Sequence, residues 1–178
     1  MSILSKCRMA PSSGNPMNIK DVKFSCVSAE YTVNLSSSSL QQVIEECIKA
    51  GMNETGGILI GSYSEDGSTA FIVEATARPA DSIARRTTFQ RGVKGLKHLL
   101  GSRWETGKYY VGEWHFHPEG SSEPSNDDFI SMKNISSNPN YQCPEPVMII
   151  LGGNPSGAYS LSANVFPRGK SPIKLAQE

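Results

Sequence analysis

Two histidines separated by one residue, His115 and His117, are the side chains in this sequence that most directly suggest metal chemistry. Side chains two positions apart in a β-strand point to the same face, so a strand here would place both imidazoles side by side. Asp128 follows at the start of a predicted helix, after a loop that contains proline and glycine and can fold back over the strand end. Two histidines and one carboxylate leave a fourth tetrahedral position for water, which is typical of a catalytic zinc site. Such a site lowers the pKa of the bound water toward ~7 and polarises a carbonyl.

Each of these residues also has a simpler interpretation. An isolated His-x-His pair is more often without function than part of a metal site. Ser125 and Asp128 have the spacing of a capping box at a helix start, and Asp128 would also interact favourably with the helix dipole. His98 lies in a predicted helix away from this cluster, and we expect it to be an ordinary surface or boundary residue.

The elements that position these residues follow from hydrophobic periodicity. Apolar residues between Leu40 and Ile48 recur at helical spacing, with serines suited to N-capping before them and Gly51 after them, so a helix is predicted. Further helices are predicted over about 88–100 and from near Ser125. Extended segments are predicted at 22–28, 31–35, 56–63, 69–77, 108–116, 147–151 and 158–165. Since several neighbouring strands are joined by short turns, the pattern indicates an α/β fold, with a mixed β-sheet flanked by helices.

A glutamate upstream of the histidines completes a longer pattern. It stands directly before a glycine-rich apolar strand, Thr55–Gly61, and a helix-bearing stretch separates this motif from the histidines. The combined pattern resembles the signature of the JAB/JAMM (MPN-type) metalloprotease family over roughly residues 22–166. The matching positions are Glu54, His115, His117, Ser125 and Asp128.

The resemblance implies a function for each matching residue. His115, His117 and Asp128 would hold a zinc ion. Glu54 would act as the general base toward the attacking water and then donate the proton to the leaving amine. Ser125 would hydrogen-bond the oxyanion of the tetrahedral intermediate. The fold implied by the family is similar to the cytidine-deaminase-like α/β sandwich.

Other segments indicate which members of the family this chain resembles, and one residue departs from the family pattern. Family members usually have Ser or Thr between the two histidines, where this chain has Phe116, which we expect to point away from the metal. The segments Gly112–Trp114 and Cys143–Val147 resemble the short bacterial JAB proteins, which are commonly encoded beside ubiquitin-like activating and conjugating enzymes, including in anti-phage operons. This implies a peptidase that removes a ubiquitin-like or conjugated protein from its target, with the cognate activating and conjugating enzymes as further partners.

Three functions are compatible with the pattern. The first is an isopeptidase that cleaves after the C-terminus of a ubiquitin-like or conjugated protein. The second is a protease that matures such a protein, or a sulfur carrier, by cutting a linear peptide bond. The third is a non-catalytic MPN-type scaffold, which usually lacks the metal ligands that this chain retains. The first two differ only in the substrate groove, which we expect to be shaped by residues 81–90 and 138–146.

The composition is that of an ordinary soluble globular protein, with 38% hydrophobic and 19% charged residues among 178. Because 17 basic and 17 acidic side chains cancel, neither nucleic acid nor a membrane is expected as a partner. Without an apolar run of membrane-spanning length or a signal peptide, the protein is expected to be cytoplasmic, with its four cysteines reduced. One group of basic residues is expected to be a solvated helix face: Arg85, Arg86, Arg91, Lys94 and Lys97.

The domain organisation expected from the sequence is simple. Residues 1–20, rich in Ser, Pro, Gly and Asn, are expected to form a flexible N-terminal arm. A single JAB/JAMM metalloprotease domain then covers 21–170, and a C-terminal tail covers 171–178.

Overall fold

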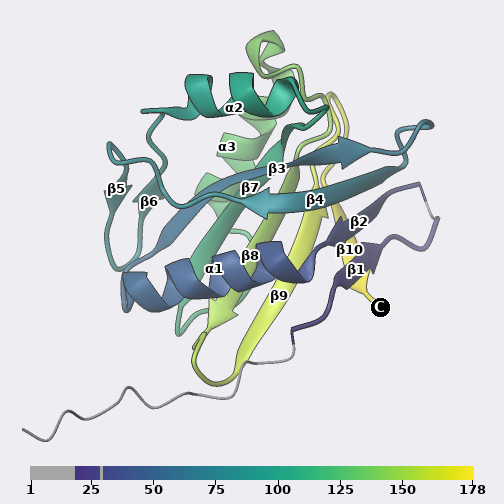
Figure 1. Cartoon of the computed structure of the whole chain (residues 1–178). Helices are drawn as coiled ribbons and strands as arrows, with labels where there is room; N and C mark the ends of the chain where they lie inside the picture. The colour runs from purple at the N-terminus through teal and green to yellow at the C-terminus, as the bar shows by residue number, and fades with distance from the viewer. Residues whose placement is uncertain (1–18, 29) are drawn as a thin grey trace, which may run out of the picture.

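A computed structural model describes residues 19–28 and 30–178 (Figure 1). Apart from its last two residues, the predicted N-terminal arm lies outside the described part of the chain. In chain order the elements are β1 (Val22–Ser25), β2 (Thr32–Leu35), α1 (Ser37–Ala50), β3 (Thr55–Tyr63), β4 (Thr69–Ala75), β5 (Ile83–Ala84), β6 (Phe89–Gln90), α2 (Leu96–Trp104), β7 (Tyr109–Pro118), α3 (Asn126–Ser137), the 3-10 turn η1 (Pro139–Tyr141), β8 (Val147–Gly153), β9 (Tyr159–Val165) and β10 (Ile173–Gln177).

The main sheet is mixed and closes on itself. Its strand order is β1-β10-β9-β8-β7-β3-β4-β2, and closure follows because β2 pairs with both β1 and β4. The pairs β2/β4 and β7/β8 are parallel, and the other pairs of this sheet are antiparallel. The short strands β5 and β6 form a separate hairpin. The predicted mixed sheet flanked by helices is confirmed, whereas the closure of the sheet was not predicted.

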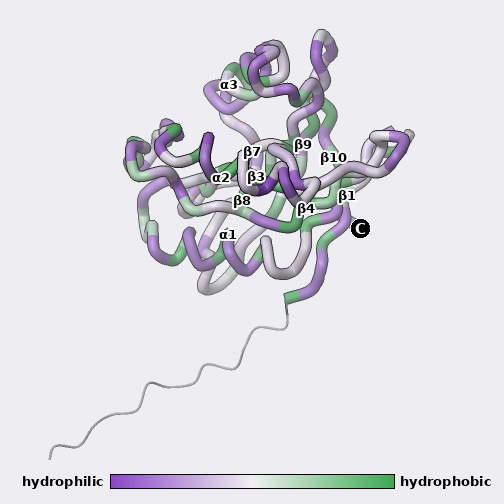
Figure 2. Tube along the Cα trace, turned by 45° about the horizontal axis from the view of Figure 1, so that its top comes forward, coloured by the Kyte–Doolittle hydropathy of each residue, from purple (hydrophilic) through white to green (hydrophobic). Residues whose placement is uncertain are grey.

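Helix α1 begins and ends as its sequence indicates. The Ser36 side chain accepts a hydrogen bond from the Ser39 N–H at the helix start, and Gly51 ends the helix with a φ of 62°, a conformation that glycine adopts at low cost. Hydrophobic and hydrophilic residues alternate along this helix (Figure 2). Its apolar side packs into a core cluster that contains Trp114 and Phe116 of β7. Phe116 is 1% exposed, so its side chain lies in this core.

Helices α2 and α3 belong to a second core cluster, on the other face of the central strands (Figure 1). The residues that β3, α3 and β8 contribute to it are Ile58, Ile60, Met132, Ile135, Met148 and Ile150, with Leu96, Leu99 and Leu100 of α2 packed against them. Since side chains alternate along a strand, β7 presents Trp114 and Phe116 to α1 and its odd-numbered neighbours to the side of α3.

The helix predicted over about 88–100 is wrong in its first half, because α2 begins only at Leu96. The carboxylate of Asp81 accepts hydrogen bonds from the N–H groups of Val93 and Lys94, which satisfies these donors in a loop instead of a helix. Gly95 precedes α2 with a φ of 84°, which also stops the helix from extending toward the N-terminus. The basic group at 85–97 is therefore not a helix face.

The C-terminal strand is a further difference from the expected organisation. Residues 171–178 were expected to form a tail, but Ile173–Gln177 make up β10, which pairs with β9 and β1. Leu175 is 3% exposed and belongs to the core cluster of α1.

Cys26, Cys47 and Cys143 are free thiols. Among the described residues, no helix has the length and apolar character needed to cross a membrane.

Candidate metal centre

Strand β7 supplies the two histidines and lies between β3 and β8 in the sheet. His115 and His117 point to the same face, and their side chains are 11% and 16% exposed. Burial in a strand with partners on both sides limits the movement of the two rings. His117 is also oriented by its Nδ1, which lies 3.0 Å from the carbonyl oxygen of Ser121 and leaves Nε2 facing Asp128.

The start of α3 supplies the carboxylate. Ser125 is the N-cap, and its Oγ accepts a hydrogen bond from the Asp128 N–H at 3.2 Å. In return, Oδ2 of Asp128 accepts from the Ser125 N–H and from its hydroxyl, both at 2.7 Å. The capping box is therefore present. The same carboxylate lies 2.7 Å from Nδ1 of His115 and 3.4 Å from Nε2 of His117, so the capping interpretation and the metal interpretation are compatible.

The three side chains fit a divalent metal ion. One ligand atom from each of His115, His117 and Asp128 can be chosen so that all three lie within 4.8 Å of one another. Ligands at zinc–nitrogen and zinc–oxygen distances of about 2.0–2.2 Å stand roughly 3.4 Å apart in a tetrahedron, so small movements suffice to bind an ion. Two imidazoles and one carboxylate are a donor set suited to zinc, with a fourth position for water.

Negative charge around the histidines favours their protonated forms in the metal-free protein. Burial opposes the charged form of His115, but the nearby carboxylates of Asp128 and Glu113 outweigh it and raise its pKa to about 9. Asp128 likewise raises the pKa of His117. Burial opposes ionisation of Asp128 too, yet hydrogen bonds from both histidines hold the pKa of this carboxyl well below its usual range. The pocket therefore stabilises positive charge, which a metal cation would supply in place of the protons.

Glu54 lies beside this cluster, immediately before β3. Its N–H donates to the carbonyl of Arg85 at 2.8 Å, which ties it to the end of β5. Its side chain lines a cavity of about 420 Å³ together with His117, Ser125 and Asp128. Burial raises the pKa of Glu54 above its ordinary value, which suits a carboxylate that must accept and then donate a proton near neutral pH. We call this space the Glu54 cavity.

The glycines after Glu54 permit a close approach of three segments. A Cβ atom at Gly56 would lie 2.8 Å from His115 Cδ2 and 2.8 Å from Phe89 Cε1, so only glycine fits there. The rings of Phe89 and His115 pack edge to face, with centroids 5.3 Å apart. The glycine-rich strand of the sequence pattern thus lets β6 and β7 pack together at the metal centre.

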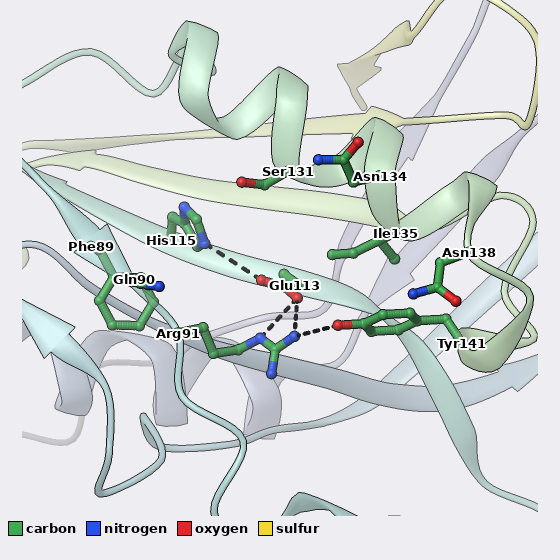
Figure 3. A pocket seen from close by; sticks show the side chains of 10 residues that line it. All are labelled: Phe89, Gln90, Arg91, Glu113, His115, Ser131, Asn134, Ile135, Asn138 and Tyr141. Atoms are coloured by element: carbon green, nitrogen blue, oxygen red, sulfur yellow. Dashed lines mark hydrogen bonds and ion pairs between the residues drawn. The ribbon is translucent and has the colours of Figure 1, made fainter.

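A second cavity of about 340 Å³ lies on the α3 side of His115, and we call it the α3 cavity. Figure 3 shows Arg91, Glu113 and His115 in a row along its floor, with Ser131 and Asn134 projecting from α3. Phe89 lines both cavities. The burial of Glu113 and its contact with Arg91 were not predicted from the sequence, since Arg91 was expected to lie on a solvated helix face. The sequence feature that could have indicated Glu113 is the strand period: Glu113 lies two positions before His115, so both side chains are on the same face of β7.

Residues 36–163 match the family described as prokaryotic homologs of the JAB domain. The chain belongs to this family. It is 67% identical over 177 residues to a CD-NTase/cGAS isopeptidase of Enterobacter hormaechei subsp. hoffmannii, covering 99% of this chain and 98% of that relative. It is 30% identical over 126 residues to the probable metalloprotease y4qB of Sinorhizobium fredii, covering 65% of this chain and 74% of that relative.

The fold resembles the solution structure of protein DSY2949 from Desulfitobacterium hafniense, with a TM-score of 0.55 at 14% identity over 79% of this chain and 86% of that chain. This likeness supports the fold alone. The family, the isopeptidase and metalloprotease relatives and the His/His/Asp cluster together confirm the predicted JAB-type metallo-isopeptidase.

Proposed function

We propose that this metallo-isopeptidase hydrolyses the bond between the C-terminal carboxyl group of a conjugated protein and a lysine side chain of its target. We infer that the conjugated protein is a CD-NTase or cGAS-like enzyme and that the reaction belongs to a bacterial anti-phage system. The observation that carries this proposal is the 67% identity to a CD-NTase/cGAS isopeptidase, which extends over nearly the full length of both chains. The His/His/Asp cluster supports it with the donor set that the reaction needs.

In this proposal the metal is zinc, and its ligands are His115, His117 and Asp128. A zinc ion there would lower the pKa of a bound water and polarise the scissile carbonyl. Glu54 takes the proton from the attacking water and passes it to the leaving lysine amine. Its position in the cavity beside His117 and its raised pKa support this role, because both transfers must occur near neutral pH.

Ser125 has two functions in the proposal. In the structure its hydroxyl donates to Oδ2 of Asp128. Rotation of the hydroxyl toward the substrate would let it donate instead to the developing oxyanion. The backbone N–H of Ser125 keeps its own hydrogen bond to Asp128, so the helix start remains partly capped when the hydroxyl turns away.

The two cavities suggest how the substrate lies. The leaving amine must be within reach of Glu54, and Glu54 lines the cavity on the His117 side. We therefore place the target lysine in the Glu54 cavity and the C-terminal tail of the conjugated protein in the α3 cavity. The exposed Ser131, Asn134 and Asn138 line the α3 cavity with polar groups that can hydrogen-bond an extended peptide backbone.

Matched substrates test this function. One carries the CD-NTase joined through its C-terminus to a lysine side chain, and the other carries the same tail in a linear fusion. We expect the zinc-loaded protein to cleave the lysine-linked form faster, and we expect chelation of the metal to abolish the reaction.

The other outcomes lead to different functions. Cleavage of the linear fusion alone would point to a maturation protease. If neither substrate is cleaved by protein with a full complement of zinc, the proposed substrate is wrong.

A further inference from the structure

Glu113 is a buried carboxylate directly behind the metal centre. It is 4% exposed and stands two residues before His115 on β7, so its side chain lies on the same face of the strand. Its Oε2 lies 3.7 Å from Nε2 of His115, which is too long for a hydrogen bond but close enough for a strong interaction between charges. Nδ1, the other nitrogen of this ring, faces Asp128 at 2.7 Å. The ring therefore stands between two carboxylates, one on the metal side and one behind it.

Arg91 holds Glu113 in this position. Its guanidinium group lies 2.8 Å from Oε1 of Glu113, and the Arg91 side chain is itself only 9% exposed. The same group donates to the Gly92 carbonyl at 2.9 Å and to the hydroxyl of Tyr141 at 3.1 Å. Tyr110 donates to the same Oε1 at 3.3 Å. These contacts occupy Oε1 and leave Oε2 facing His115, as Figure 3 shows.

Stability alone does not account for this arrangement. A buried ion pair often stabilises a protein no better than well-packed apolar side chains of similar volume, because both charges lose their hydration. An apolar pair at 91 and 113 could join β6 to β7 equally well. What an apolar pair cannot do is place a negative charge beside the outer nitrogen of a metal-binding imidazole. His117 also has a polar partner at its outer nitrogen, since its Nδ1 lies 3.0 Å from the Ser121 carbonyl oxygen.

We propose that Glu113 is a positioning residue for the metal, holding the His115 ring with Nδ1 toward His117 and Asp128, and that Arg91 fixes Glu113 for this task. A partner of this kind fixes the tautomer and orientation of a ligating histidine and raises its basicity as a ligand. Arg91 directly follows β6, which contains Phe89. The ion pair between Arg91 and Glu113 therefore also connects β6 to the strand that carries His115. The proposal rests on the metal centre of the proposed function and is independent of the substrate.

The test measures metal binding without any substrate. Zn²⁺ affinity is determined by competition with a chromogenic chelator, and the absorption spectrum of the Co²⁺-loaded protein reports the ligand geometry. We expect Glu113→Gln to weaken Zn²⁺ binding about 10- to 100-fold and to change the Co²⁺ spectrum. The matched control is Glu74→Gln, which removes an ion pair with Arg103 on another part of the sheet and should leave both readouts unchanged.

A double variant separates positioning from stability. Arg91→Met/Glu113→Leu replaces the ion pair with apolar side chains, which should preserve the fold even if Glu113→Gln does not. We expect the folded double variant to show the same weakened Zn²⁺ binding and altered Co²⁺ spectrum. Wild-type affinity together with a wild-type spectrum in this variant would overturn the positioning role. A wild-type protein that binds neither ion would overturn the metal centre as well, whereas failure to cleave a conjugate despite bound metal would affect the proposed function alone.

Discussion

Oδ1 of Asp128 lies 2.7 Å from Nδ1 of His115, although Asp128 belongs to the first turn of α3 and His115 to strand β7. The other oxygen of the same carboxylate accepts two hydrogen bonds from Ser125, the N-cap of α3. The capping box thus fixes Asp128 where the histidines can reach it. Formation of the helix start and the approach of Asp128 to the two histidines are therefore one structural event, so a substitution at Ser125 should also alter the position of Asp128.

Replacing one of the three proposed metal ligands tests directly whether they bind the metal. We expect His117→Ala to lower Zn²⁺ affinity by more than the roughly 10- to 100-fold loss typical of an outer partner, because it removes a ligand itself. His98→Ala is the matched control, since His98 is exposed on α2. The measurement is zinc content after dialysis against a weak chelator. Equal zinc in wild type and His117→Ala would mean that the ligand set is wrong.

Two substitutions separate the functions of Ser125. Ser125→Ala should destabilise the protein by about 1 kcal/mol through loss of the cap, whereas Ser125→Gly should cost only a few tenths of that. Both remove the hydroxyl, so both should lower kcat about 100- to 1,000-fold if it donates to the oxyanion. Thermal unfolding and single-turnover cleavage check the two effects. A Ser125→Gly protein with wild-type kcat would leave Ser125 as a helix cap only.

The pKa of His115 predicts how pH affects the metal-free protein. Its value is raised from 6.5 to about 9 on folding, so the stabilisation is fully present below pH 6.5 and is lost as pH rises through about 9. We expect the Tm of chelator-treated protein to fall over this range by more in wild type than in His115→Gln. With zinc in place of the proton, the rise in Tm on adding metal should grow over the same range. Equal pH dependence of Tm in both proteins would mean that the pKa of His115 is not raised on folding.

The sequence predicted those parts of the structure that local patterns determine. Helix α1 carries its capping serine, its apolar period and its terminal glycine within one segment. The strand period alone predicts that His115 and His117 lie on the same face of β7. It also predicts that Phe116 lies on the opposite face, where it packs in the core cluster that contains α1. Asp128 could be placed in the first turn of α3 because its spacing from Ser125 is that of a capping box.

Features that depend on distant partners could not be predicted in this way. β6 was assigned to a helix because its pairing with β5 and the contact of Arg91 with Glu113 are not visible in the local pattern. β10 is short and follows a proline, and it becomes a strand because β1 and β9 offer it edges on both sides. The contact of Arg91 with Glu113 and the pairing of β10 with β1 join residues that are far apart in the sequence.

In the proposed reaction Glu54 transfers the proton while three other residues hold the metal. The most direct test compares Glu54→Gln with wild type for zinc content and for cleavage of the lysine-linked conjugate, measured on the same samples. We expect full zinc occupancy and a rate about 100- to 10,000-fold lower in Glu54→Gln, because in the proposed reaction Glu54 transfers protons and is not a metal ligand. A wild-type rate in fully loaded Glu54→Gln would contradict it.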